Sequence, residues 1–92
     1  MERKFSMNEC ISKLNQTDVN EIVALHIYYN NFAIHSSYTM DEIGVKENNV
    51  YISSGETEIR INLDECEIYF NNDEYENFKF KNGDMEINID FL

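Results

Sequence analysis

The chain has 92 residues and a formal net charge of -11 at pH 7, from 18 acidic and 7 basic side chains. This length predicts one domain with a limited core. The charge opposes binding to nucleic acid or to an anionic membrane and favours a basic partner. It is also uneven, because residues 1–40 carry a net charge of -1 and residues 41–92 a net charge of -10. Acidity that only keeps a β-rich protein soluble remains an alternative explanation.

The sequence contains neither an apolar run of 18 residues nor a signal-peptide pattern, so we expect a cytoplasmic protein without a membrane segment. Two cysteines, Cys10 and Cys66, are too few for a disulfide framework. Both lie at apolar positions of their segments and are expected to be buried free thiols. A hydrophobic content of 42% indicates a folded chain.

The first predicted element is a short helix over about residues 7–15. Ser6 and Glu9 have the spacing of a capping box, in which each side chain accepts a hydrogen bond from the other residue's backbone N–H. Cys10 and Leu14 then share one face. A helix this short is not stable alone, so that face must pack against the rest of the protein.

The second predicted element is a hairpin around Asn30 and Asn31, since Asn tolerates the positive φ angles of a tight turn. This turn pairs Tyr29 with Phe32. Residues 18–29 could instead form a helix, because Asp18 to Glu21 also has capping-box spacing. The β-branched and aromatic content of the segment favours the strand.

Further hairpins are predicted around residues 46–49, 55–56, 64–65 and 82–83, each with apolar side chains opposite apolar side chains. The predicted pairs are Val45 with Val50, Ile52 with Ile59, Ile61 with Ile68, Phe80 with Met85, and Phe78 with Ile87.

The predicted fold is therefore α+β and forms a single domain over residues 1–92. A short N-terminal helix packs on an antiparallel β-meander of about seven or eight strands, which covers about residues 21–92. Only one sheet face is consistently apolar, so either the helix covers that face or the sheet curls toward a barrel.

The other sheet face is predicted to be polar and acidic. Side chains two apart on a strand lie about 6.5 to 7 Å apart and neighbouring strands about 4.8 Å apart, which is of the order of the spacing of nucleic-acid phosphates. Tyr and Asn between the carboxylates add rings and amide groups useful to an interface. A simple solvated face is the alternative. The predicted partner-binding residues are Glu58, Glu67, Glu86 and Asp90, with Tyr51 and Tyr69 as anchors.

Catalytic and metal chemistry have weak support in the sequence. His26 and His35 lie opposite each other in the predicted hairpin and could form part of a zinc site or a pH switch. A structural zinc site needs four ligands, so two ordinary surface histidines and no metal are favoured. Asp64 and Glu65 are paired carboxylates at a predicted hairpin tip, where nothing excludes water. No catalytic motif is present, and we expect neither an enzyme nor a cofactor.

The size, the acidity, a composition rich in residues with AT-rich codons (13 Asn and 11 Ile) and the lack of catalytic motifs characterise this chain. In these respects it resembles the small acidic inhibitors that phages and mobile elements of AT-rich bacteria encode, including anti-CRISPR proteins and other DNA mimics. The resemblance implies a stoichiometric inhibitor that binds a basic nucleic-acid-binding host defence protein, such as a nuclease. Such inhibitors have many unrelated folds, so no functional residue is carried over. Direct binding of nucleic acid is not expected, because the seven basic residues are scattered.

The alternative function is a homo-oligomeric structural β module without nucleic-acid mimicry. The first hairpin has an apolar second face, which would be buried between subunits, in a homodimer for instance. This face consists of Ile22, Ala24, Tyr28 and Ala33. Both functions can hold together, because a dimer can present two acidic faces.

Overall fold

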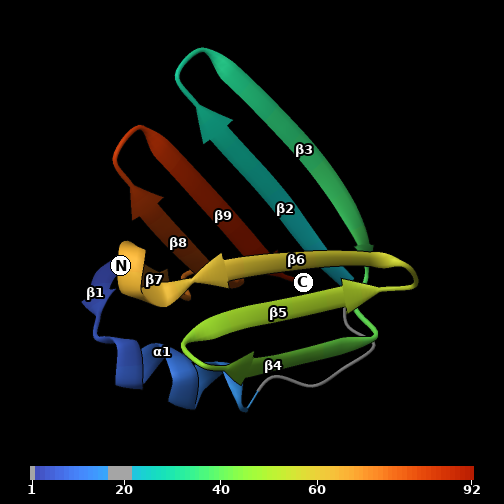
Figure 1. The fold of residues 1–92 in the computed structure, drawn as a ribbon, viewed down its shortest axis with the longest axis horizontal. Coiled ribbons are helices and arrows are strands. Elements are labelled where there is room, and N and C mark those ends of the chain that lie inside the picture. Colours follow the sequence, from blue (N-terminus) through green and yellow to red (C-terminus); the bar gives the residue numbers. More distant parts are fainter. Residues whose placement is uncertain (1, 17–21) are drawn as a thin grey trace.

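The computed structural model describes residues 2–16 and 22–92 and contains, within them, two antiparallel sheets and one α-helix (Figure 1). The larger sheet has the strand order β1-β7-β8-β9-β2-β3, and the smaller has the order β4-β5-β6. Both sheets are open, so the curling toward a barrel is not observed. The strands are β1 (Arg3–Phe5), β2 (Ile22–Tyr29), β3 (Phe32–Thr39), β4 (Glu42–Lys46), β5 (Asn49–Ser54), β6 (Thr57–Asn62), β7 (Glu67–Asn71), β8 (Glu76–Asn82) and β9 (Met85–Phe91).

The helix α1 (Met7–Leu14) confirms the predicted N-terminal helix and its capping box. The backbone N–H of Glu9 donates to Ser6 Oγ at 3.1 Å, and the backbone N–H of Ser6 donates to Glu9 Oε1 at 3.0 Å. The hydrogen bond from Ser6 lowers the pKa of the Glu9 carboxyl. Cys10 and Leu14 are buried, as their shared face requires, and α1 packs beside β1 and β4.

The core lies where the inner face of the larger sheet meets the smaller sheet and α1. Phe78, at the centre of β8, is fully buried, and its ring lies 5.0 Å from that of Phe70 and 6.0 Å from that of Phe91. Val50, Ile52 and Ile61 of the smaller sheet are buried in the same cluster. The smaller sheet therefore covers much of the apolar face, for which the sequence analysis considered only the helix or a curled sheet.

The predicted meander is wrong at Asp64 and Glu65, which do not form a hairpin turn. Residues Leu63–Glu65 form a short 3-10 helix, η1, and the chain passes there from one sheet to the other. Leu63 is buried in the core, and the side chain of Asn62 accepts a hydrogen bond from the backbone N–H of Asp64 at 2.9 Å. The strands before and after Leu63–Glu65 therefore do not pair with each other, and Leu63 is buried in the core instead of pairing in a hairpin.

The larger sheet is completed by two pairings that a simple meander does not contain. The N-terminal strand β1 pairs with β7, and β9 pairs with β2, so that Ile27 lies opposite Ile87 and Leu25 opposite Ile89. Within β2 the helical alternative for residues 18–29 is wrong. Residues 18–21 lie outside the described residues.

Three predicted hairpin registers are confirmed, namely those of β2–β3, β4–β5 and β5–β6. The loop between β4 and β5 is shorter than predicted, because Lys46 pairs with Asn49. Its two turn residues, Glu47 and Asn48, have φ angles of 52° and 61°. Positive φ at both central positions is what a type I′ hairpin turn requires.

The register of the β8–β9 hairpin differs from the prediction. Asn82 pairs with Met85, so Gly83 and Asp84 form the turn and Phe80 lies opposite Ile87 rather than Met85. Gly83 has a φ angle of 58° at the first turn position, where a type II′ turn needs glycine. Gly83 is therefore a turn residue in both registers, the second in the predicted turn and the first in the observed turn.

Candidate interaction surface

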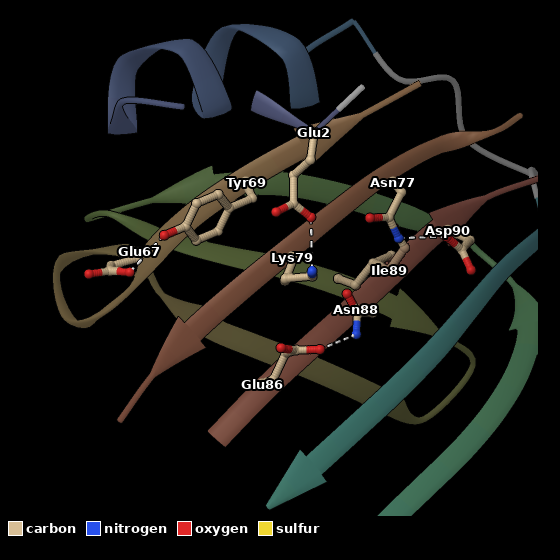
Figure 2. Close-up of polar contacts among 9 residues, drawn as sticks. All are labelled: Glu2, Glu67, Tyr69, Asn77, Lys79, Glu86, Asn88, Ile89 and Asp90. Atoms are coloured by element: carbon tan, nitrogen blue, oxygen red, sulfur yellow. Dashed lines mark hydrogen bonds and ion pairs between the residues drawn. The ribbon is translucent and has the colours of Figure 1, made fainter. Parts of the chain in front are cut away.

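Four of the six predicted binding residues lie together on the outer face of the larger sheet. Glu67 and Tyr69 project from β7 and Glu86 and Asp90 from β9, with β8 between the two strands (Figure 2). Tyr51 and Glu58 belong to the smaller sheet. The predicted site is therefore divided between two sheets and is not one continuous face.

Two of the carboxylates on the outer face are held by a neighbour two residues further along the same strand. The hydroxyl of Tyr69 donates to Glu67 Oε2 at 2.9 Å, and Asn88 Nδ2 donates to Glu86 Oε2 at 2.8 Å (Figure 2). The hydrogen bond to Glu67 raises the pKa of the Tyr69 hydroxyl. Both carboxylates are thereby oriented by a residue of their own strand, with Glu67 exposed and Glu86 half-buried.

Two basic side chains of β8 share this outer face, although the predicted set of outer-face residues left them out. The pairings across β7, β8 and β9 place Lys81 between Glu67 and Glu86. Lys79 Nζ lies 2.8 Å from Glu2 Oε2, and this hydrogen bond raises the pKa of the Lys79 ammonium group (Figure 2). The centre of the predicted acidic face therefore also contains basic side chains.

Much of the excess negative charge lies instead at the ends of the strands. Among the described residues, eight carboxylates occupy turns, bends or η1 rather than strands. Turn positions project into solvent and impose no alternation on their side chains. These residues are Asp41, Glu47, Glu56, Asp64, Glu65, Asp73, Glu74 and Asp84.

Five carboxylates gather where η1 approaches the turn between β8 and β9, and we name this group the acidic rim. Its members are Asp64, Glu65, Glu67, Asp84 and Glu86. Three of them line an open hollow together with Lys81, Asn82 and Gly83. Five carboxylates against one lysine give the rim and Lys81 a net charge of -4. The rim is therefore more acidic than the centre of the adjoining outer face, and it shares Glu67 and Glu86 with the predicted site.

The predicted residues on the smaller sheet are engaged with a basic side chain. The guanidinium of Arg60 lies 3.5 Å from Glu58 and stacks 5.0 Å above the ring of Tyr51. Arg60 therefore neutralises the carboxylate and covers part of the aromatic ring. This arrangement leaves Tyr51 and Glu58 poorly suited to a basic partner.

The predicted placement of His26 opposite His35 is confirmed. Their Nδ1 atoms lie 2.7 Å apart, and His26 Nε2 lies 3.5 Å from Asp90 Oδ2. The other carboxylate oxygen, Asp90 Oδ1, accepts a hydrogen bond from Asn77 Nδ2 at 2.6 Å. One ring donates and the other accepts in the Nδ1 contact, with the roles set by the tautomers. Over residues 2–16 and 22–92, no group of three or more His, Cys, Asp or Glu side chains could hold a metal ion.

Both cysteines are free thiols, as predicted, although their burial differs. Cys10 is 0% exposed, and burial raises its thiol pKa to about 12, with a further contribution from Cys66. Cys66 is half-buried and donates from Sγ to the backbone carbonyl of Asn62 at 3.3 Å. Burial also raises the pKa of Cys66, so neither thiol is activated as a thiolate at neutral pH.

A second surface contrasts with the rim, because residues 22–40 contain no Asp, Glu, Lys or Arg. This segment forms the β2–β3 hairpin, whose turn extends away from the smaller sheet (Figure 1). The hairpin carries five of the large apolar side chains that are exposed, namely Ile22, Tyr28, Tyr29, Phe32 and Ile34. Sequence analysis identified only Ile22 and Tyr28 of this patch. The 19 consecutive residues without a charged side chain were the signal that could have identified the others.

The chain matches no protein-family model, no curated protein and no solved structure. Among the helical residues that the structure describes, none belongs to a helix long and apolar enough to cross a membrane.

Proposed function

We propose that this protein is a small non-catalytic inhibitor that binds the basic nucleic-acid-binding surface of a host defence protein, such as a nuclease. In this proposal, which includes an anti-CRISPR-like role and a phage or mobile-element origin, the bound inhibitor excludes nucleic acid from its site. The observation that carries the proposal is the acidic rim, three of whose five carboxylates line an open hollow that contains a single lysine.

The positions of the ion pairs within the protein support the rim as the contact surface. Four carboxylates form ion pairs with Lys or Arg of the described chain, and all four lie outside the rim. They are Glu2, Glu9, Glu58 and Glu76. Seven basic side chains cannot neutralise 18 acidic ones, and a basic groove would supply the missing charge and accelerate association.

The geometry of Glu67 and Glu86 further supports a preformed contact. Their strands lie on either side of β8, which places their backbones about 9 to 10 Å apart at the usual strand spacing. Hydrogen bonds from Tyr69 and Asn88 fix both carboxylates before a partner arrives. Fixed side chains lose less conformational entropy on binding, so more of the electrostatic attraction is retained as affinity.

The test begins with the immobilised protein and a lysate of a bacterium with an AT-rich genome, eluted by rising salt. We expect to recover a nucleic-acid-binding protein that a DNA or RNA duplex displaces from the inhibitor. Affinity for the purified partner should fall as salt rises, because exposed charges are screened. Capture of only the bait, or of partners that nucleic acid does not displace, would contradict inhibition by charge mimicry.

The contact surface is tested by reversing charges in matched pairs. Glu67→Lys combined with Glu86→Lys should weaken partner binding by about tenfold or more while the protein stays folded. The control combines Glu56→Lys with Glu74→Lys, which changes the net charge by the same amount. Glu56 precedes β6 and Glu74 follows β7, so both lie at the ends of these strands that are far from η1. If both double variants weaken binding to the same extent, net charge alone acts and the rim is not the contact.

A homo-oligomeric structural module is a second candidate, favoured by the exposed apolar side chains of the β2–β3 hairpin. Ile22 and Tyr28 lie on the outer face of β2 and are exposed. Burial of this face between subunits predicts a stable dimer that Tyr28→Glu converts to monomers. A wild-type protein that sediments as a monomer would exclude this candidate.

A further inference from the structure

The four edge strands of the two sheets differ in how they are protected. β1 carries Arg3 and Lys4, β4 carries Glu42 and packs beside α1, and β6 carries Glu58 and Arg60. Charged side chains and covering elements are common devices that prevent an edge from pairing with another chain.

The edge strand β3 has none of these devices. Its sequence, Phe32–Thr39, contains no Lys, Arg, Asp, Glu or Pro, and seven of its eight residues are exposed. Phe32 is 59% exposed and Ile34 is 45% exposed. A strand of this length, uncharged and at an open edge, is the arrangement that proteins usually avoid unless another strand covers it.

The backbone of β3 also presents a regular set of unpaired groups. The two-residue turn at Asn30 and Asn31 makes Tyr29 and Phe32 a hydrogen-bonded pair, and hydrogen-bonded pairs then recur at every second residue. The alternate residues of β3 therefore direct their N–H and C=O groups away from β2. These residues are Ala33, His35, Ser37 and Thr39.

From this geometry we infer that a second copy of the chain pairs with β3, antiparallel and edge to edge, to form a symmetric dimer with a continuous sheet of twelve strands. A two-fold axis perpendicular to β3 makes the strand antiparallel to its own copy by symmetry alone. The inference concerns self-assembly and holds independently of the proposed inhibition.

One register satisfies the whole edge. When Ser36 lies opposite Ser36 of the other copy, all four outward-facing residues find partners, and four pairs exchange two hydrogen bonds each. In this register His35 faces Ser37 and Ala33 faces Thr39, so no like charges meet. A shift of one residue in each copy places His35 opposite His35 and leaves Thr39 without a partner.

A second copy fits this surface better than a charged partner does. Residues 22–40 carry no formal charge in a protein of net charge -11, so β3 is where two copies approach with the least repulsion. Phe32 and Tyr29 alone leave about 200 Å² exposed, given their exposed fractions of 59% and 48%. This is about a third of the ~600 Å² per partner found at the lower end of stable interfaces.

Sedimentation equilibrium over a range of protein concentrations tests the dimer. The wild type should reach twice the monomer mass of 10.9 kDa, and more readily as salt rises, because salt screens the repulsion between two acidic molecules. Ser37→Pro removes an N–H that points to the open edge while leaving the pairing with β2 intact. The loss of two hydrogen bonds per dimer should raise the dissociation constant about 10- to 100-fold.

A matched pair of variants separates the edge from general charge effects. Ser37→Lys places a charge on the edge, whereas Ser12→Lys places the same charge on the exposed side of α1. Only Ser37→Lys should dissociate the dimer, and circular dichroism should show both variants folded. A wild type that stays at 10.9 kDa, or a dimer that survives both Ser37 variants, would overturn the inference. A dimer broken by Tyr28→Glu but not by Ser37→Pro would overturn it in favour of the outer face.

Discussion

The burial of Cys10 predicts that the fold loses stability in alkaline solution. Cys10 is 0% exposed, and burial raises its thiol pKa from 9.0 to about 12 in the folded state. Between these two values the unfolded chain releases the thiol proton and the folded chain keeps it, so stability falls as pH rises. Three pKa units correspond to about 4 kcal/mol at the limit, and to about 1 kcal/mol at pH 10.

The measurement compares urea unfolding of the wild type and of Cys10→Ala at pH 7 and pH 10. Cys66 and Tyr38 also have pKa values raised by burial, and their effects cancel in the comparison because both proteins contain them. The wild type should lose about 1 kcal/mol more than Cys10→Ala between the two pH values. Equal losses in both proteins would refute the reasoning and show that the Cys10 thiolate is accommodated in the folded state.

Two further predictions concern the core and the turns. Phe78→Leu should lower the free energy of unfolding by about 1 to 2 kcal/mol, because the fully buried ring packs against four other phenylalanines, whereas Tyr75→Leu on the exposed surface should change it by less than about 0.5 kcal/mol. Urea unfolding of both variants measures this difference, and equal effects would contradict the observed packing. Gly83→Ala should cost about 1 kcal/mol because Gly83 has a φ angle of 58°. Gly44→Ala, at a strand position with equally open space around it, should be neutral or stabilising, and reversed effects of the two would contradict the β8–β9 turn.

The hairpins that turn chemistry specifies could be predicted from the sequence, and those that it leaves ambiguous could not. Asn30 with Asn31, and Gly55 as the first turn residue, identified the β2–β3 and β5–β6 registers. In the β8–β9 hairpin both Met85 and Ile87 are apolar partners for Phe80. A change of two in the partner's position keeps every side chain on its face, so apolar sorting could not distinguish the predicted register from the observed one.

The division into two sheets depends on contacts that no local pattern encodes. Leu63 alternates with its neighbours as a strand residue would, yet it begins η1 and is buried in the core where the chain crosses between the sheets. The pairing of β2 with β9 joins residues about 60 positions apart, and no turn signal specifies so distant a partner. Periodicity identified the strands but not their order in space.

The candidate site was predicted strand by strand, and its errors have a simple cause. Glu67, Tyr69 and Glu86 occupy the outer face as alternation requires. The same alternation places Lys79 and Lys81 on that face, because the alternate residues Phe78 and Phe80 are buried in the core. The prediction left these lysines out, which made the face look more acidic than it is. Asp64 and Glu65 were considered only as paired catalytic carboxylates, although they belong to the acidic rim.

The two proposed surfaces predict salt effects of opposite sign, which separates them in one preparation. Contact between the acidic rim and a basic partner is an attraction between opposite charges and weakens as salt rises. Pairing of β3 with its copy brings two molecules of net charge -11 together through an uncharged strand, so screening should strengthen it. Sedimentation of the free protein and of its mixture with the partner across a salt series therefore yields two opposing trends. A self-association that weakens with salt would place charged groups in the contact and exclude the β3 edge as its centre.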